Sequence, residues 1–412
     1  MKWLASLGPY VEDGAKTMLL MFLSLTALIF LLHTILALSH RYSIGYGEAP
    51  LVDQAMRLAS GRNIYRSDLS SPPYTISNYP PLYPLLMAPF VKLFGPSYLP
   101  GRVISLLSTL ASGVFLALIV YLHSQDRLAT TVTALLFLSI RYVVGWSSAA
   151  RVDMLALALS TAGLYVVTRW PTTRRGLVIS SLLLVAAIYT RQSYGLAAPL
   201  AAFVWLLTQD WRQALRLAVL VGGVGLALFL GLDALTRGGF YFNIVTANVN
   251  EFDWERVQYW WRNLRETASI LLILGGVTLF LTPRRVKVWS LVMPYLIGSG
   301  LSAVTIGKIG SSINYLLELS AALSVVVGTL LAWSREHQWL RIFLFILLTL
   351  QVGQLMKTTL HGPVEWLKWR LHPVKELEDL EWIVQTADGP VLADEFMGML
   401  TLQDRPLYIQ PF

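Results

Sequence analysis

The sequence contains no cysteine, and only 14% of its 412 residues are charged. The absence of cysteine excludes disulfides, thiolate metal ligands and thiol catalysis. The six histidines are scattered, without the spacing of a metal site. Soluble domains carry about 25% charged residues, so the low charge argues against a soluble protein. With 55% hydrophobic residues and a mean hydropathy of +0.57, the composition instead predicts a membrane protein.

The net charge of +8 does not indicate nucleic-acid binding, because the basic residues occur in small groups between apolar runs rather than in one patch. Lys and Arg are densest in alternate connecting segments, such as 169–175 and 284–287. Under the positive-inside rule, this pattern predicts a multi-pass protein of the plasma membrane with a cytoplasmic N-terminus. Residues 46–86 and the C-terminus are then outside.

Long apolar runs predict an all-α polytopic membrane protein with about eleven transmembrane helices. The first run, 17–39, contains no charged residue apart from His33 and is long enough to cross a hydrocarbon core of about 30 Å. We expect it to remain as an anchor. The predicted spans are 17–39, 101–122, 129–146, 154–168, 177–189, 195–208, 217–233, 268–282, 288–305, 315–332 and 341–356.

The polar stretch 46–86 follows the first span and holds two carboxylates, Glu48 and Asp53. They begin an amphipathic segment that ends at Gly61 and could lie at the membrane interface. Either acid could be a general base that takes a proton from an attacking hydroxyl or amine. Alternatively, both are solvated loop acids, and Asp53 only pairs with Arg57 at i,i+4.

Two further groups of polar residues lie at ends of predicted spans. Arg151 and Asp153 precede the span 154–168, where charged side chains are costly and often functional. The alternative is a contact between them that caps the helix. Arg191 and Gln192 interrupt two apolar runs, and an Arg fork suits a phosphate. A snorkelling arginine is equally consistent with this position.

A last polar turn contains Lys308, followed by Asn314, Tyr315 and Glu318 on one helical face. Glu318 lies within an apolar run, so we expect either a substrate site or a structural ion pair with Lys308 or Arg191. The aromatic-rich segment 240–266 is predicted to be an interfacial helix or lid, or simply an aromatic belt, and no catalytic residue is placed there.

The chain is predicted to have two parts. Residues 1–356 form the transmembrane domain, with an outer catalytic loop at 40–100 that contains interfacial helices. Residues 357–412 form a small outer C-terminal α/β segment, with strands expected at 391–394 and 407–410. This segment is too small to bury a core alone, so it either packs on the membrane domain or begins a longer α/β domain.

The first outer loop resembles the corresponding loop of a known enzyme superfamily. Glu48 after the first span, Tyr65 after a helix that ends in glycine, the sequence Tyr-Pro-Pro-Leu-Tyr at 79–83, and Leu-Phe-Gly before Arg102 resemble the GT-C superfamily of glycosyltransferases. The loop is similar to bacterial and archaeal relatives of the protein O-mannosyltransferases and of the lipid A aminoarabinose transferase. Tyr79 and Tyr83 are candidate substrate contacts or an interfacial anchor.

The resemblance implies a polyprenyl-phosphate sugar donor, inversion at the anomeric carbon, and an outer-loop acid as base. Many members carry an Asp-Glu pair where this chain has Gly47-Glu48, so Glu48 takes the role alone, with Asp53 as second choice. The resemblance also implies that Asp153 lines the pocket and that Arg191 and Gln192 contact the carrier phosphate.

The predicted function is therefore an inverting membrane glycosyltransferase. Its partners are the lipid-linked donor, membrane lipid, and a lipid, polysaccharide or protein acceptor, with no nucleic acid. No pattern in the sequence requires a cofactor. A divalent metal is compatible with the sequence, because several acids of the predicted outer segments could chelate one. The alternatives are a polytopic transporter or lipid flippase, for which repeated halves would be expected, and a non-catalytic scaffold.

Overall fold

The computed structural model describes residues 2–281, 288–372, 374–394 and 396–409. Within these residues, regular structure is helical throughout, apart from one isolated antiparallel bridge between Phe252 and Lys308. The prediction of an all-α protein is confirmed. Three basic residues of the predicted inner side, Arg284, Arg285 and Lys287, lie outside the described residues.

Eight helices in the described part of the chain are long and apolar enough to cross a membrane, which makes this a multi-pass membrane protein. Three shorter apolar helices accompany them, and the predicted total of eleven crossings stays a prediction. The eight candidate spans are Leu7–Ser39, Leu99–Ser124, Val152–Arg169, Trp211–Leu235, Trp254–Phe280, Trp289–Gly307, Ile313–Glu336 and Gln338–Trp369; the shorter helices are Leu82–Phe94, Arg127–Ser139 and Gln192–Leu207.

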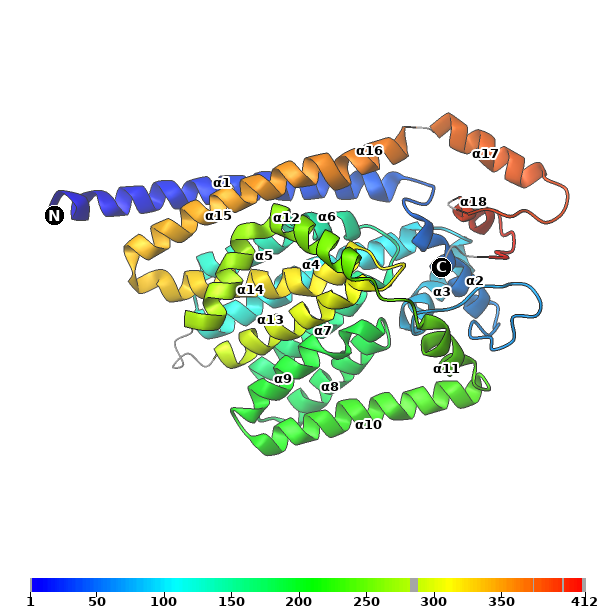
Figure 1. Ribbon diagram of the computed structural model, residues 1–412, viewed down its shortest axis with the longest axis horizontal. Helices are drawn as coiled ribbons and strands as arrows, with labels where there is room; N and C mark the ends of the chain where they lie inside the picture. Colours follow the sequence, from blue (N-terminus) through cyan, green and yellow to red (C-terminus); the bar gives the residue numbers. More distant parts are fainter. Residues whose placement is uncertain (1, 282–287, 373, 395, 410–412) are drawn as a thin grey trace.

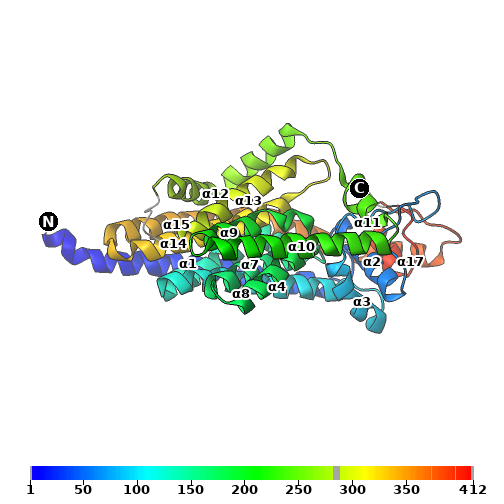
Figure 2. The same ribbon diagram turned by 90° about the horizontal axis from the view of Figure 1, so that it is seen from below.

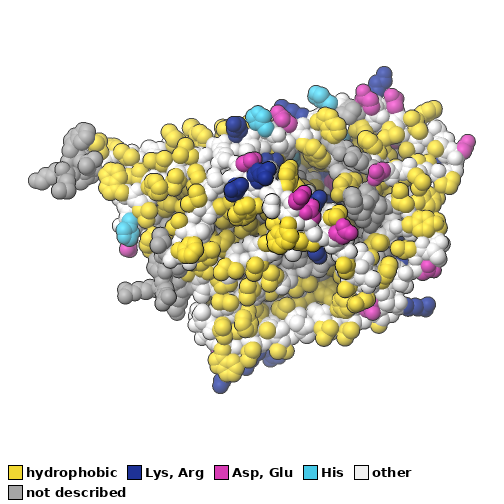
Figure 3. All heavy atoms as spheres, viewed as in Figure 1, with side chains coloured by type: hydrophobic (Ala, Val, Ile, Leu, Met, Phe, Trp, Pro, Cys, Tyr) yellow, Lys and Arg dark blue, Asp and Glu magenta, His cyan; other side chains and the backbone are white. Residues whose placement is uncertain are grey.

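The membrane helices form a bundle whose long axes run from left to right in Figures 1 and 2, and hydrophobic side chains cover much of the face in Figure 3. The bundle helices are α1 (Lys2–Ser39), α4 (Leu99–Ser124), α5 (Arg127–Ser139), α6 (Arg141–Trp146), α7 (Val152–Arg169), α8 (Arg174–Ile188), α9 (Ala197–Leu207), α10 (Trp211–Leu235), α12 (Trp254–Leu281), α13 (Trp289–Val304), α14 (Leu317–Trp333) and α15 (Gln338–Thr359).

Helices α7 and α14 form the centre of the bundle, and α10 lies at its edge. The apolar windows of the spans that contain α7 and α14 are 78% and 83% buried, whereas that of α10 is 6% buried. Glycine allows the close packing at the centre: a Cβ on Gly328 of α14 would lie 1.9 Å from Oγ1 of Thr133 on α5. The apolar surface of α10 is left for lipid.

The helices outside the bundle gather at one end, opposite the N-terminus (Figures 1 and 2). They come from the segments predicted to be outside: the first loop, the 240–266 segment and the C-terminal segment. They are η1 (Tyr46–Glu48), α2 (Ala49–Ala59), α3 (Leu82–Phe94), α11 (Gly239–Ile244), η3 (Thr246–Asn248), α17 (Val374–Thr386) and α18 (Met397–Leu402).

Helix α12 is kinked at Ala268, which has non-helical backbone angles. The Gln351 side chain on α15 satisfies the freed backbone groups: its Oε1 accepts from the amide of Ile270 at 2.9 Å, and its Nε2 donates to the carbonyl of Thr267 at 2.8 Å. Such compensation is needed where water is absent. The kink separates a polar half of α12 from an apolar half at the predicted start of the span.

Helix α15 does not end at the predicted boundary of 356. It continues through a π-helical turn, η7 (Leu360–Val364), into α16 (Glu365–Leu371). Pro363 explains the turn, because proline has no amide hydrogen and its ring clashes with the carbonyl one α-helical turn before it. The division of the chain into two domains stays a prediction.

The C-terminal segment packs on the first outer loop. Leu377, Met397 and Leu400 form a cluster with Tyr42 and Ala49. The strand expected at 391–394 is absent, and the described residues 407–409 also form no strand; Gln410 lies outside the described residues. These two predictions are wrong because neither segment finds a strand to pair with.

Candidate functional site

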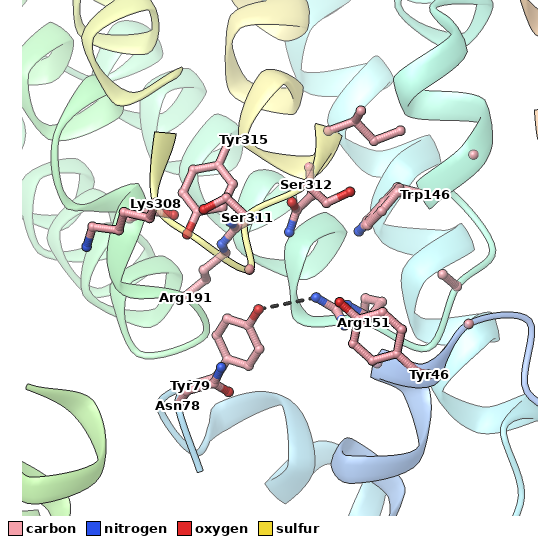
Figure 4. A pocket seen from close by; sticks show the side chains of 18 of the residues that line it. Tyr46, Asn78, Tyr79, Trp146, Arg151, Arg191, Lys308, Ser311, Ser312 and Tyr315 are labelled. Atoms are coloured by element: carbon pink, nitrogen blue, oxygen red, sulfur yellow. Dashed lines mark hydrogen bonds between the residues drawn. The ribbon is translucent and has the colours of Figure 1, made fainter. Parts of the chain in front are cut away.

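A cavity of about 1460 Å³ lies between the end of the bundle and the helices that gather there. Six parts of the chain line it: the first loop, the α6–α7 region, the turn after α8, the segment from the end of α11 to residue 250, the loop between α13 and α14, and the junction of α15 with α16. Its size suits a substrate much larger than a single sugar. Figure 4 shows Tyr46 and Tyr79 from the first loop facing Arg151, Arg191 and the 308–315 segment.

Arg191 lines the cavity and is held from behind by the buried Asp153. Asp153 begins α7, and its Oδ1 accepts from Arg191 Nη1 and from Asn314 Nδ2, the latter at 2.9 Å; its Oδ2 accepts from Trp146 Nε1 at 2.9 Å. The second terminal nitrogen of Arg191, Nη2, is buried without a hydrogen-bond partner among the described residues. The guanidinium lies 4.4 Å from the ring centroid of Tyr315. Arg191 therefore has a free donor beside the cavity, and its orientation is fixed.

Arg191 and Asn314 thus meet at the carboxylate of Asp153, and these three candidates from separate parts of the chain form one network. Arg191, Asn314 and Tyr315 line the cavity, whereas Asp153 lies behind the wall. The expectation that Asp153 contributes to the pocket stays a prediction; its contacts are those of a residue that orients the wall.

Arg151 is the second guanidinium of this network. Its Nε lies 3.6 Å from Oδ2 of Asp153, and its Nη2 donates to the Tyr79 hydroxyl at 3.2 Å, the bond drawn in Figure 4. Burial raises the pKa of the Tyr79 hydroxyl, and the neighbouring charge of Arg151 opposes the shift. A Cβ on Gly47 would lie 1.6 Å from Nη1 of Arg151. The glycine therefore makes room for this guanidinium.

Glu48 is buried, and both of its oxygens are occupied. Oε1 accepts from Arg102 Nε at 3.0 Å and from the Ala150 amide at 2.7 Å. Oε2 accepts from Arg102 Nη2 at 2.8 Å and from the Ile44 amide at 2.7 Å. A carboxylate has about four lone-pair sites, so Glu48 has no free site for a substrate proton. Its contacts join the first loop to α4 and to the start of α7.

Asp53, Tyr83 and Glu318 are not among the described residues that line the cavity. Asp53 pairs with Arg57 at 2.8 Å, as the alternative interpretation expected, and burial raises the pKa of its carboxyl group against the opposing charge of Arg57. The Tyr83 hydroxyl donates to the Gly101 carbonyl in the core between α3 and α4. Glu318 is buried within α14, and its Oε1 has no hydrogen-bond partner among the described residues.

Lys308 and Gln192 line the cavity, and their role in substrate binding stays a prediction. The Lys308 ammonium has no hydrogen bond or ion pair with any described residue. Its loop is pinned to the 240–266 segment: Arg256 Nη2 donates to the Ser311 carbonyl at 2.7 Å, and Asn250 Nδ2 donates to the Ile309 carbonyl at 2.8 Å. Residues 244, 245 and 247–250 line the cavity too, which fits the predicted lid.

Several lining residues were missed from the sequence. Arg141 begins α6 and adds a further cation to the wall, and it had a usable signal, because it is a charged residue at the end of an apolar helix. The π-helical turn had no signal beyond its Gly-Pro pair. The other missed residues include Tyr46, Asn78, Trp146, Asn248, Ser311, Ser312, His361, Glu365 and Trp366.

Among the charged residues that line the cavity, cations outnumber acids. Arg141, Arg151, Arg191 and Lys308 line it, whereas its described acids are Glu48, whose charge Arg102 neutralises, and Glu365. No group of three or more His, Asp or Glu side chains that could hold a metal ion occurs in the described part of the chain. Such a wall can hold an anionic ligand without a metal bridge.

Comparisons with known proteins agree on the fold. The family model described as dolichyl-phosphate-mannose-protein mannosyltransferase matches residues 78–232. ArnT from Cupriavidus metallidurans bound to undecaprenyl phosphate has a TM-score of 0.66, and its apo state 0.62; each is 13% identical, with 94% of this chain and 85% of that chain covered.

A third solved structure is the archaeal oligosaccharyltransferase AglB from Archaeoglobus fulgidus, in complex with an inhibitory peptide and a dolichol-phosphate. It has a TM-score of 0.53 and 11% identity, with 94% of this chain and 64% of that chain covered. No curated protein sequence matches the chain. The architecture described above is thus the fold of these membrane proteins.

Proposed function

We propose that this chain, which belongs by its fold to the GT-C superfamily of glycosyltransferases, moves a sugar from a polyprenyl-phosphate carrier to an acceptor at the outer face of the plasma membrane, with inversion. The observation that carries the proposal is the cationic cavity at the end of the bundle. The solved relatives with this fold hold undecaprenyl phosphate or dolichol-phosphate. The N-terminus is cytoplasmic and the cavity opens outside in this proposal.

The carrier phosphate would lie between Arg191 and Lys308. Arg191 is held by Asp153, and its Nη2 has no hydrogen-bond partner among the described residues. Lys308 forms no ion pair with a described acid, and Tyr315 lies beside both cations. Charge-assisted hydrogen bonds from fixed donors stabilise a phosphate, and they do so most when it leaves with additional negative charge. The aromatic rings of Tyr79 and Tyr315 line the same space and offer faces for a sugar.

The reaction is a single displacement. The acceptor atom attacks the anomeric carbon, the bond from that carbon to the phosphate oxygen breaks, and the electron pair leaves with the polyprenyl phosphate. One attack from the opposite face gives inversion. The attacking group loses its proton, so a base is needed when the acceptor is a hydroxyl or an amine.

Glu48 has a positioning role in this proposal. Its four hydrogen bonds hold Arg102, Ile44 and Ala150, and so fix the loop that carries Tyr46 and Gly47 beside Arg151. Asp53 is not at the cavity. The proton acceptor must therefore be sought elsewhere on the wall.

The test uses the purified chain in proteoliposomes with undecaprenyl-phosphate-linked and dolichyl-phosphate-linked radioactive sugars and a solubilised membrane fraction as acceptor. Wild-type protein should release polyprenyl phosphate and label the acceptor fraction. Lys308→Gln should weaken undecaprenyl phosphate binding by about tenfold to a hundredfold, since a hydrogen bond to a charged group contributes about 1.5–3 kcal/mol.

Arg62→Gln is the matched control, because Arg62 is an exposed arginine of the first outer loop away from the cavity. It should bind and transfer like wild type. Movement of labelled lipid between leaflets without any sugar release would support the flippase alternative and refute the proposal. Equal undecaprenyl phosphate binding by wild type and Lys308→Gln would refute the assigned phosphate site.

A further inference from the structure

The cavity contains one histidine, His361, on the π-helical turn between α15 and α16. Its Nδ1 lies 2.9 Å from the carbonyl oxygen of Lys357. A carbonyl oxygen can only accept, so Nδ1 carries the hydrogen of the neutral ring. The lone pair is then on Nε2, and the ring is exposed at the cavity wall. His361 thus has the tautomer that a proton acceptor requires.

The turn itself is unusual. Pro363 widens the helix here, and π-helical turns occur frequently at functional sites. The turn packs against the start of α6, where a Cβ on Gly362 would lie 2.8 Å from Nη2 of Arg141. Arg141 of α6 and Glu365 of α16 line the same cavity as His361, and Lys357 precedes His361 by four residues on the same helical run.

The hydrogen bonds of Glu48 exclude it as the base and leave Glu365 as the carboxylate that competes with His361 for this role. Two described residues of the cavity wall carry a carboxylate, Glu48 and Glu365. Glu48 already accepts four hydrogen bonds. Glu365 is exposed on the same helical run as His361, four residues further on. The cations assigned to the phosphate come from the turn after α8 and from the α13–α14 loop, so the α15–α16 turn supplies a separate part of the wall.

We infer that His361 is the general base of the transfer reaction and that the acceptor is a hydroxyl or an amine. This inference rests on the proposed function. The acceptor's O–H or N–H gives its proton to Nε2 of His361 as the new bond to the anomeric carbon forms. The bond from that carbon to the phosphate oxygen breaks, the carrier takes the electron pair, and the imidazolium later returns its proton to water. An acceptor that attacks through a phosphate oxygen would need no such base.

The decisive variant is His361→Asn. The Asn amide can still donate to the Lys357 carbonyl, and it has no counterpart of Nε2. Transfer should fall by about a hundredfold to ten-thousandfold, the usual contribution of a general base. The acidic limb of the pH dependence of kcat should disappear, while undecaprenyl phosphate binding stays within twofold of wild type. His337→Asn, at the opposite end of α15, is the matched control and should keep both the rate and the pH profile.

Each other result overturns the assignment. Transfer by His361→Asn at the wild-type rate refutes it, and so does a lower rate with the acidic limb retained, which would indicate a structural role. A large loss in Glu365→Gln with an active His361→Asn would assign the base to Glu365. If the wild-type chain transfers no sugar from either lipid donor, the proposed function fails before this variant is tested.

Discussion

The buried pair of Glu48 and Arg102 gives the sharpest test of how the first outer loop works. Arg102 is fully buried, and besides its two bonds to Glu48 it donates to the carbonyls of Ala37, His40 and Tyr42, with Nη1–Ala37 at 2.9 Å and Nη2–Tyr42 at 2.6 Å. All the guanidinium donors are therefore directed at the end of α1 and at the loop that follows. The pair is expected to anchor this loop to the bundle.

Glu48→Gln keeps the size of the side chain but replaces one acceptor oxygen by an amide donor. Either orientation of the amide directs this donor at an Arg102 nitrogen and at a backbone amide, and the buried guanidinium is left without a counter-charge. Breaking a buried ion pair in this way costs about 3–5 kcal/mol. We therefore expect a lower free energy of unfolding, of about that size, and a loss of activity that follows from the disturbed loop.

A double-mutant cycle isolates the pair. Glu48→Leu and Arg102→Met should each be strongly destabilising, and the double variant should lose less than the sum, because no buried charge remains without its partner. The double variant will still be less stable than wild type, because the backbone carbonyls and amides that bond to the pair lose their partners. Each buried group left without a partner costs about 1–3 kcal/mol of stability. The measurement is the free energy of reversible unfolding in mixed micelles, with sugar transfer measured on the same samples.

The reasoning is refuted if Glu48→Gln unfolds at the same denaturant concentration as wild type and yet transfers no sugar. That result would make Glu48 a chemical participant despite its four hydrogen bonds. Strict additivity in the cycle would also refute it, because it would show that the two charges do not depend on each other.

Two further predictions concern the same loop. Gly47→Ala should lower transfer at least tenfold, because its Cβ would lie 1.6 Å from Nη1 of Arg151. Gly45→Ala should keep wild-type transfer in the same assay, because a Cβ there would lie 4.0 Å from the Trp366 ring. Equal rates for the two variants would contradict the close packing. Asp53→Asn should keep transfer, because Asp53 is paired with Arg57 away from the cavity. Burial raises its folded-state pKa, so the folded protein binds this proton more readily than the unfolded chain and stability falls as pH rises above about 4. Denaturation of Asp53→Asn across this range should show a flatter pH dependence, and an inactive variant would return Asp53 to the list of bases.

Much of the site could be found from the sequence because charged residues at the ends of apolar runs are costly and conspicuous. That signal identified Asp153 and Arg191 separately, and the structure joins them through one carboxylate. The same signal applies to Arg141, which begins the apolar helix α6. The helical composition was likewise readable from hydropathy, because lipid leaves few alternatives to helices.

Other features depend on contacts that no local pattern encodes. Glu48 has the sequence position of a catalytic acid, and only the fold shows that Arg102 and two backbone amides occupy its oxygens. The segment 391–394 has strand-like residues, but a strand requires a partner that this part of the chain does not provide. The continuation of α15 past Gly362-Pro363 was missed because a Gly-Pro pair usually ends a helix, whereas here the turn widens and the helix proceeds.

The pairing of acids with arginines explains why the cavity should favour a neutral base. Glu48 is held by Arg102 and Asp153 by Arg191, so neither carboxylate is free at the wall, whereas the lining cations Arg141 and Lys308 form no ion pair with a described residue. A free carboxylate beside the carrier phosphate would repel it at close range in a site from which water is partly excluded. A neutral imidazole carries no such penalty before reaction, and the proton it gains adds a positive charge as the phosphate gains a negative one. If this reasoning is correct, replacing His361 by Glu should weaken undecaprenyl phosphate binding as well as transfer, whereas His361→Asn should affect transfer alone; equal binding by both variants would show that repulsion does not govern the choice of base.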